Sequence, residues 1–147
     1  MRTTQKETEL RTIPLFAACT REELRLVARM METVDVRPGT QLCREGRRAG
    51  QFVAVVSGTA VVTEDGRPVA MLAPGGHTGE VDVLLREDSE RTVTATTHMR
   101  VVVCDPRRFI TLVEAAPTVA RRLLVGLAGR VRYFSASTLS AAAMSDV

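Results

Sequence analysis

Aromatic residues are scarce in this chain, which has no tryptophan, one tyrosine and four phenylalanines among 147 residues. Proteins that bind nucleic acid usually combine clustered basic residues with stacking aromatic side chains or a recognition helix. The net charge is only +3, and every basic residue except Lys6 is an arginine, spread along the whole sequence. Composition therefore does not favour nucleic acid as a partner.

Cysteines are few and widely separated. None of them belongs to a Cys-x-x-Cys pair, and each lies in an apolar stretch: Cys19, Cys43 and Cys104. Such spacing does not favour a zinc site or a redox motif. We therefore predict reduced, buried packing residues in a cytoplasmic protein.

Histidines are rarer still, which bears on metal chemistry. His77 and Glu80 form a His-x-x-Glu pair that raises the alternative of a cupin-type metal enzyme. Sites of that type usually need two or three closely spaced histidines. Because His98 is the only other histidine, we predict no metal, no other cofactor and no enzymatic activity, and a metal enzyme stays a minor alternative.

Long hydrophobic runs are absent. None approaches the roughly 20 residues that a membrane-spanning helix needs, and residues 1–9 lack the apolar centre of a signal peptide. Hydrophobic residues nevertheless make up 45% of the chain, and the mean hydropathy is +0.04. We therefore expect one soluble, cytoplasmic domain with its own core and no membrane partner.

The first third of the chain has helical patterning. Thr20 and Glu23 have the spacing of a capping box, in which a hydroxyl and a carboxylate satisfy the free N–H groups of a helix start. Apolar residues then recur at helical spacing: Leu24, Val27, Ala28 and Met31. A helical turn is expected over residues 7–12, followed by a short apolar elbow at residues 13–16.

From residue 34 to residue 105 the pattern changes to that of strands. Eight of the ten glycines lie between Gly39 and Gly79, where they separate short β-branched runs. We predict strands at residues 52–56, 59–63, 69–72, 91–97 and 100–104. Asp65-Gly66 is a strong signal for a two-residue hairpin turn. Many short strands at this spacing favour a closed antiparallel barrel or jelly roll.

The last third returns to helix. Asp105 is a good N-cap, and Pro106 suits the first position of the helix that follows. That helix is expected to end near residue 116. Apolar residues recur every three or four positions from Val119 to Phe134 and predict a second helix over residues 117–134. Residues 135–147 are small and polar, and we predict a disordered tail there.

The most informative segment is residues 74–95, in which a glycine-bearing turn enters a short apolar helix and an arginine heads the next strand. Free N–H groups at a helix start, with Arg91 facing them, would form a cradle for a phosphate. Glu80 adds a carboxylate that could accept a hydrogen bond from a sugar hydroxyl. A phosphate together with a ribose indicates a nucleotide.

This segment resembles the phosphate-binding cassette of cyclic nucleotide-binding domains, whose usual form is Phe-Gly-Glu-x-Ala/Gly-Leu, a variable loop, and Arg-Thr/Ser/Ala-Ala. The turn glycines of residues 37–58 and the elbow at residues 13–16 extend the resemblance over roughly residues 13–132. It places the chain in the superfamily of the cAMP receptor protein and the regulatory subunits of protein kinase A. The site residues that it implies are Gly79, Glu80, Val81, Asp82, Val83, Arg91 and Thr92.

In these residues the resemblance implies distinct roles. Arg91 would bind the cyclic phosphate, Glu80 would bind the ribose 2′-hydroxyl, and Gly79 would allow close approach of the backbone. Residues 81–83 would contribute backbone N–H groups. Thr92 could hold a guanine amino group, which leaves the choice between cAMP and cGMP open.

The resemblance also implies an α+β fold. We expect an antiparallel β jelly-roll barrel flanked by N-terminal helices and two C-terminal helices. The domain would cover residues 1–134, with the helix elbow and barrel at 13–104 and the C-terminal helices at 105–134. No DNA-binding or second regulatory domain is expected after residue 134, so the resemblance implies a stand-alone sensor. The C-terminal helix would move on binding or contact an effector protein or a second copy of the chain.

Asp82 departs from the family pattern, which has a small residue at this position. A carboxylate about 4 Å from a phosphate costs roughly 1 kcal/mol in water and roughly 4 kcal/mol at an effective dielectric constant of 20. Val93 and Thr78 also replace the usual alanine and the frequent aromatic residue. An alternative therefore remains open, in which the domain is a degenerate scaffold for protein interaction that binds no nucleotide.

Overall fold

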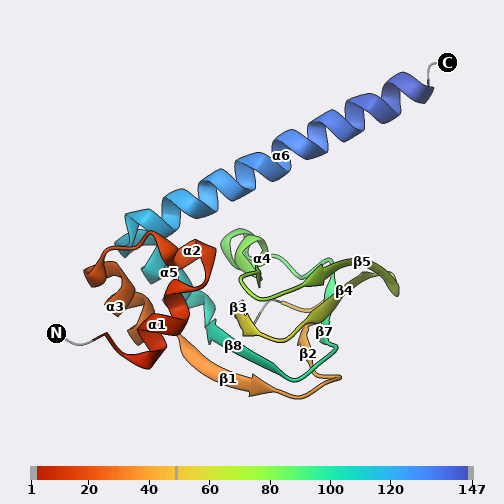
Figure 1. Cartoon of the computed structure of the whole chain (residues 1–147). Coiled ribbons are helices and arrows are strands. Elements are labelled where there is room, and N and C mark those ends of the chain that lie inside the picture. Colours follow the sequence, from red (N-terminus) through yellow and green to blue (C-terminus); the bar gives the residue numbers. More distant parts are fainter. Residues whose placement is uncertain (1–2, 49, 146–147) are drawn as a thin grey trace.

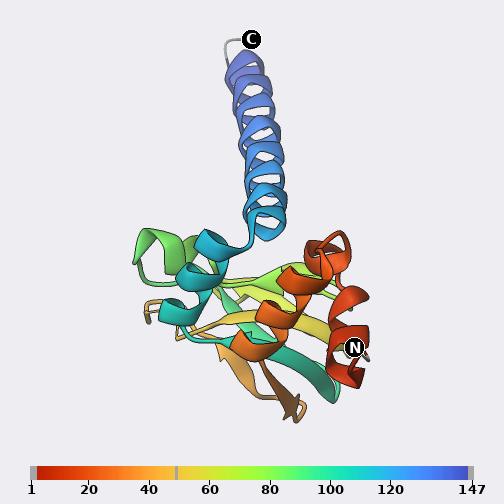
Figure 2. The ribbon, with the colours of Figure 1, turned by 90° about the vertical axis from the view of Figure 1, so that its left-hand side faces the viewer.

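The computed structural model describes residues 3–48 and 50–145, with side chains described up to residue 132. The N-terminal helices lie on one side of an antiparallel β barrel, next to the start of a long C-terminal helix that projects from the body of the domain (Figures 1 and 2). The helices are α1 Gln5–Arg11, α2 Pro14–Ala17, α3 Arg21–Met30, α4 Glu80–Leu85, α5 Pro106–Ala115 and α6 Pro117–Ser145. The strands are β1 Glu32–Val36, β2 Gln41–Cys43, β3 Phe52–Ser57, β4 Ala60–Glu64, β5 Arg67–Leu72, β6 His77–Thr78, β7 Thr92–Ala95 and β8 Met99–Cys104.

The strands form two antiparallel sheets. One has the order β1-β8-β3-β6 and the other the order β2-β7-β4-β5. The predicted α+β class, with a jelly-roll-like barrel and flanking helices, is thereby confirmed. Most neighbouring strands are far apart in the sequence, as the pairing of β1 with β8 shows, whereas β4 and β5 are consecutive.

The sheet that contains β3 and β8 is buried on both faces. In β3, Phe52 and Ala54 belong to the core beneath the helices, whereas Val53 and Val55 belong to the core inside the barrel. Successive side chains of a strand point to opposite faces. The continuous apolar run in β3 therefore joins two cores, one between sheet and helices and one between the two sheets.

The predicted hairpin turn is confirmed between β4 and β5. Glu64 pairs with Arg67, and the two residues between them have positive φ angles, 52° at Asp65 and 77° at Gly66. Both central residues of a type I′ turn need positive φ, and this turn matches the twist of the flanking strands.

The predicted helix starts are also confirmed. Thr20 and Glu23 form a capping box at the start of α3, and the Asp105 side chain accepts a hydrogen bond from Arg108 N at the start of α5. The helical turn predicted at residues 7–12 is α1, which begins with a second capping box formed by Thr4 and Glu7.

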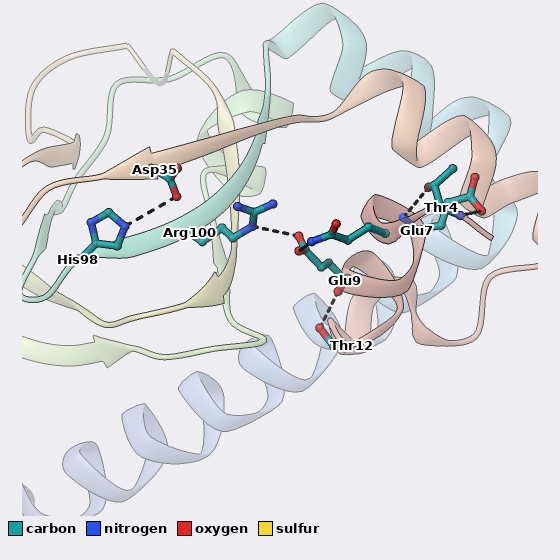
Figure 3. A network of polar contacts seen from close by, with 8 residues as sticks. Thr4, Glu7, Glu9, Thr12, Asp35, His98 and Arg100 are labelled. Atoms are coloured by element: carbon teal, nitrogen blue, oxygen red, sulfur yellow. Dashed lines mark hydrogen bonds and ion pairs between the residues drawn. The ribbon is translucent and has the colours of Figure 1, made fainter. Parts of the chain in front are cut away.

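Polar contacts join α1 to the barrel (Figure 3). The guanidinium Nε of Arg100, on β8, lies 3.1 Å from Oε2 of Glu9, on α1. Nearby, Nε2 of His98 lies 3.7 Å from Oδ1 of Asp35 on the neighbouring strand β1. The first contact fixes the N-terminal helix against the outer face of the sheet.

The C-terminal helix differs from the prediction in its length. It continues from Pro117 to Ser145, so residues 135–145 are helical where we predicted a disordered tail. This stretch contains four alanines and neither glycine nor proline, so nothing in it breaks a helix. The last two residues of the predicted tail, 146–147, lie outside the described residues. Among the described residues, no helix combines the length and apolar character needed to cross a bilayer.

The cysteines are all free, and two of the three are buried as predicted. Burial raises the pKa of Cys19 to about 11 and that of Cys104 to about 12, so both thiols stay protonated. The prediction holds only in part for Cys43, which is half-buried and packs against the core inside the barrel. Its Sγ is 2.9 Å from the hydroxyl of Ser89.

Candidate functional site

Helix α4 begins at the end of the barrel on the side from which α6 extends (Figure 1). It is preceded by Gly79, which has φ of 97° and therefore a left-handed conformation. A Cβ atom on Gly79 would lie 2.5 Å from the carbonyl oxygen of Gln51, which is backbone and cannot turn aside. The turn into α4 thus requires glycine both for its backbone angles and for its close approach to the start of β3.

A cavity of about 420 Å³ opens beside this turn. It brings residues 79–82 together with Arg91, which follows them by nine positions across an acidic loop. Its wall consists of Cys43, Val62, Ala70, Met71, Leu72, His77, Thr78, Gly79, Glu80, Val81, Asp82, Glu90, Arg91, Val93 and Arg130. Apolar residues from β4, β5 and β7 thus face a polar edge formed by α4 and Arg91.

Glu80 is buried, with only 3% of its surface exposed, and the side chains of Arg130 and His77 approach its carboxylate. Arg130 Nη1 donates a hydrogen bond to Oε1 at 3.1 Å, and His77 Nδ1 lies 3.1 Å from Oε2. Burial alone would raise the pKa of Glu80, but His77 and Arg130 outweigh burial, so the pKa is lowered and the group is ionised at neutral pH.

One oxygen of this buried carboxylate has unused capacity. The contact of Oε2 with His77 is close but not aligned as a hydrogen bond, and Oε2 has no other hydrogen-bond partner among the described residues. Buried polar atoms normally have such partners. Oε2 is therefore a buried acceptor in the wall of the cavity that has no hydrogen bond among the described residues.

Arg91 is held loosely. More than half of its side chain is exposed, and its closest carboxylate is Glu64, with Nε 3.9 Å from Oε2. A separation of this size is an ion pair without a hydrogen bond. The guanidinium therefore keeps its donors available at the mouth of the cavity.

Asp82 also lines the cavity, and its side chain is tied to the loop that precedes Arg91. The hydroxyl of Ser89 donates a hydrogen bond to Oδ2 at 3.0 Å. The pKa of Asp82 is raised, first by burial and then by the negative charges of Glu80, Glu90 and Glu87. The structure therefore places a carboxylate in a region of negative potential beside the proposed phosphate site.

Two of the predicted site residues do not reach the cavity. The N–H group of Val83 donates to the carbonyl oxygen of Gly79 at 3.0 Å, and its side chain is part of the core. The hydroxyl of Thr92 accepts a hydrogen bond from Glu45 N at 3.1 Å, on the face of β7 opposite to the buried Val93. The N–H group of Val83 is therefore already paired within the helix, and Thr92 is not part of the cavity wall.

Arg130 was not among the site residues that the sequence predicted. Its position relative to Leu123 and Leu127 carried a usable signal. Residues 123, 127 and 130 repeat at the spacing of one helix face, and Leu123 is buried. A small cavity of about 50 Å³ between α6 and Glu80 is lined by all three of these residues.

Metal binding has little support in this region. Within residues 3–48 and 50–145, the structure contains no group of three or more histidine, cysteine, aspartate or glutamate side chains close enough to hold a metal ion. His77 and Glu80 do approach each other, with Nδ1 3.1 Å from Oε2 in the wall of the cavity, but no third such side chain among the described residues joins them.

The chain is similar to proteins that carry this fold. It is 34% identical to a cAMP-dependent protein kinase regulatory subunit of Yarrowia lipolytica over 94 residues, which cover 63% of this chain and 25% of that protein. The catabolite activator protein of Thermus thermophilus is 25% identical with a TM-score of 0.73, over 81% of this chain and 58% of that one. A structure of PKAR CBD2 bound to Sp-2Cl-cAMPS is 19% identical with a TM-score of 0.72, and the match covers 88% of each chain, which shows the shared fold.

The chain spans about a quarter of the length of the curated relatives that it matches. The sequence profile of the cyclic nucleotide-binding domain matches residues 33–116, which is more than half of the chain and includes the whole cassette. The chain therefore belongs to the cyclic nucleotide-binding domain family.

Proposed function

We propose that this domain binds a cyclic nucleotide, cAMP or cGMP, in the cavity between α4 and Arg91. The observation that supports it best is that two complementary groups line the same cavity. One is a buried carboxylate with an acceptor oxygen that has no hydrogen bond, and the other is an exposed arginine whose donors have no hydrogen bonds. A ribose hydroxyl and a phosphate carry the matching donor and acceptor groups.

In this proposal each residue has a defined role. Arg91 binds the equatorial phosphate oxygens through charge-assisted hydrogen bonds, which are stronger than neutral ones. The backbone at Val81 and Asp82 lies at the start of α4, where helix N–H groups lack partners within the helix. Glu80 Oε2 accepts a hydrogen bond from the ribose 2′-hydroxyl, and the base packs against the apolar wall.

Binding at Glu80 would act directly on α6. The carboxylate that would receive the ribose also holds Arg130, fourteen positions into that helix. A ligand with differential affinity for two positions of α6 would shift the population between them. We therefore propose a regulatory role in which the position of α6 is the output.

Helix α6 is also the surface proposed for a protein partner. Leu124, Val125 and Val131 are exposed apolar side chains of this helix, which projects from the body of the domain (Figure 2). Soluble monomers seldom leave several large apolar side chains of one helix in water without a use. The proposed partner is a second copy of the chain or an effector protein.

Asp82 favours a second candidate function. Its carboxylate lines the cavity where other members of the family are expected to have a small residue. Repulsion between Asp82 and a phosphate would weaken binding, and in the limit the domain would be an interaction scaffold that responds to no nucleotide.

Calorimetric titration of ligand-free protein with cAMP and with cGMP distinguishes these two functions. We expect a saturable heat of binding with at least one of them. Protein verified to be free of co-purified nucleotide that gives no heat with either ligand would contradict the first function and support the scaffold.

The same titration is expected to depend on pH. Burial and the neighbouring carboxylates raise the pKa of Asp82, whereas the pKa of Glu80 is lowered, so Asp82 takes up its proton at a higher pH than an ordinary aspartate does. Loss of the negative charge on Asp82 removes the repulsion on the phosphate. Affinity for the cyclic nucleotide should therefore rise as the pH falls through the pKa of Asp82. The Asp82→Asn variant should lack this rise, and a rise of equal size in the variant would assign it to another group.

A further inference from the structure

The charges around the cavity are not evenly balanced. Glu80 is paired with Arg130, and Arg91 lies 3.9 Å from Glu64. Asp82 has the hydroxyl of Ser89 as a partner, and no cation among the described residues forms an ion pair with it. The net effect is an uncompensated carboxylate in the part of the wall nearest to the start of α4.

This imbalance acts differently on charged and uncharged ligands. A cyclic phosphate brings a second negative charge to Asp82, and like charges at contact distance repel strongly where water is partly excluded. The raised pKa of Asp82 shows that negative charge is already unfavourable at this point. An uncharged ligand would meet no such repulsion.

The hydrogen-bonding groups of the two kinds of ligand also favour an uncharged nucleoside. In a cyclic nucleotide the 3′ and 5′ oxygens are esterified to phosphorus and have no proton to donate. In a nucleoside both are hydroxyl groups. Asp82 uses Oδ2 to accept from Ser89, and no other hydrogen bond to this carboxylate is found among the described residues. Its remaining oxygen can accept from such a hydroxyl, as Glu80 Oε2 can accept from the 2′-hydroxyl.

We propose that Asp82 is a specificity-determining residue that makes this cavity bind an uncharged nucleoside at least as tightly as the cyclic nucleotide with the same base. Asp82 accepts a hydrogen bond from the ribose hydroxyl that replaces the phosphate ester. This inference rests on the proposed function, because it uses the same cavity and the same ribose contact at Glu80.

The test is a set of calorimetric titrations of the full chain with adenosine, guanosine, cAMP and cGMP. Each ligand is titrated into the wild type, Asp82→Ala and Asp82→Asn. In the wild type the nucleoside should bind at least as tightly as its cyclic nucleotide. In Asp82→Ala the order of affinities should reverse. The affinity for the cyclic nucleotide should rise by about tenfold or more, and the affinity for the nucleoside should fall by about tenfold or more. Asp82→Asn keeps an acceptor oxygen without the charge. Its affinity for the cyclic nucleotide should therefore rise, and its affinity for the nucleoside should fall less than that of Asp82→Ala.

Other outcomes overturn the inference in distinguishable ways. Wild-type protein that binds a cyclic nucleotide but no nucleoside contradicts the inference and leaves the proposed function standing. An unchanged order of affinities in a folded Asp82→Ala or Asp82→Asn variant also contradicts it. Absence of binding for all four ligands in all three proteins contradicts both the inference and the proposed function.

Discussion

Replacing Arg91 with alanine is expected to lower the affinity for a cyclic nucleotide by about 30-fold or more, because truncating one partner of a desolvated charged pair typically costs about 2–5 kcal/mol. The reason lies in the geometry of the cavity. Arg91 lines it, and the guanidinium donates no hydrogen bond to any of the described residues. Calorimetry or a competition assay with cAMP and cGMP measures the change.

The Arg91→Ala substitution should leave the free energy of unfolding nearly unchanged. Arg91 is 57% exposed, and its ion pair with Glu64 spans 3.9 Å, so it contributes little to folding. Arg48 offers a matched control, since it is 66% exposed and pairs with Asp88 at 3.3 Å but does not line this cavity. Arg48→Ala should bind like the wild type. Equal affinities in Arg91→Ala and the wild type would show that the phosphate is bound elsewhere.

Replacing Gly79 with alanine is expected to destabilise the fold by about 1–3 kcal/mol and to abolish measurable nucleotide binding. An L-residue is strained at φ of 97°, and its Cβ would lie 2.5 Å from the carbonyl oxygen of Gln51. Relief requires the turn into α4 to move away from β3, which displaces Glu80 and the helix start together. Thermal or urea denaturation measures the first effect and calorimetry the second.

Gly129 provides the comparison for this substitution. It lies in α6, is exposed, and an added Cβ would meet no atom within 4 Å. Gly129→Ala should raise stability by up to about 1 kcal/mol, since alanine is the better helix former. Gly79→Ala protein as stable as the wild type would mean that the turn does not have the conformation described above.

Local signals in the sequence were sufficient for much of the fold. The capping box at Thr20 and the turn at Asp65-Gly66 depend on residues a few positions apart, and both are found in the structure. The strands that the sequence did not reveal include β2, with three residues, and β6, with two. Strands this short have no periodicity of their own, and they exist because a neighbouring strand supplies their hydrogen bonds.

The site was predicted less completely, for reasons of long-range geometry. Glu80 and Arg130 are fifty positions apart, and only the placement of α6 over the cassette brings them together. Thr92 lies next to Arg91, but alternation along β7 turns its hydroxyl toward Glu45. Val83 follows the free N–H groups of α4 by one position, so its own N–H already belongs to the helix. Each difference follows from an exact backbone register that residue spacing alone does not define.

The central claim is that the cavity beside α4, and no other part of the surface, receives the nucleotide. Proton–nitrogen NMR spectra of ligand-free protein, recorded during a titration with cAMP and cGMP, test it most directly. We predict saturable shifts of the amide signals of residues 79–82 and of the Arg91 side chain, with smaller shifts at Arg130. Shifts confined to the neighbouring cavity lined by Arg44, Arg47 and Arg48, or no shifts in the cassette at saturating ligand, would contradict the account.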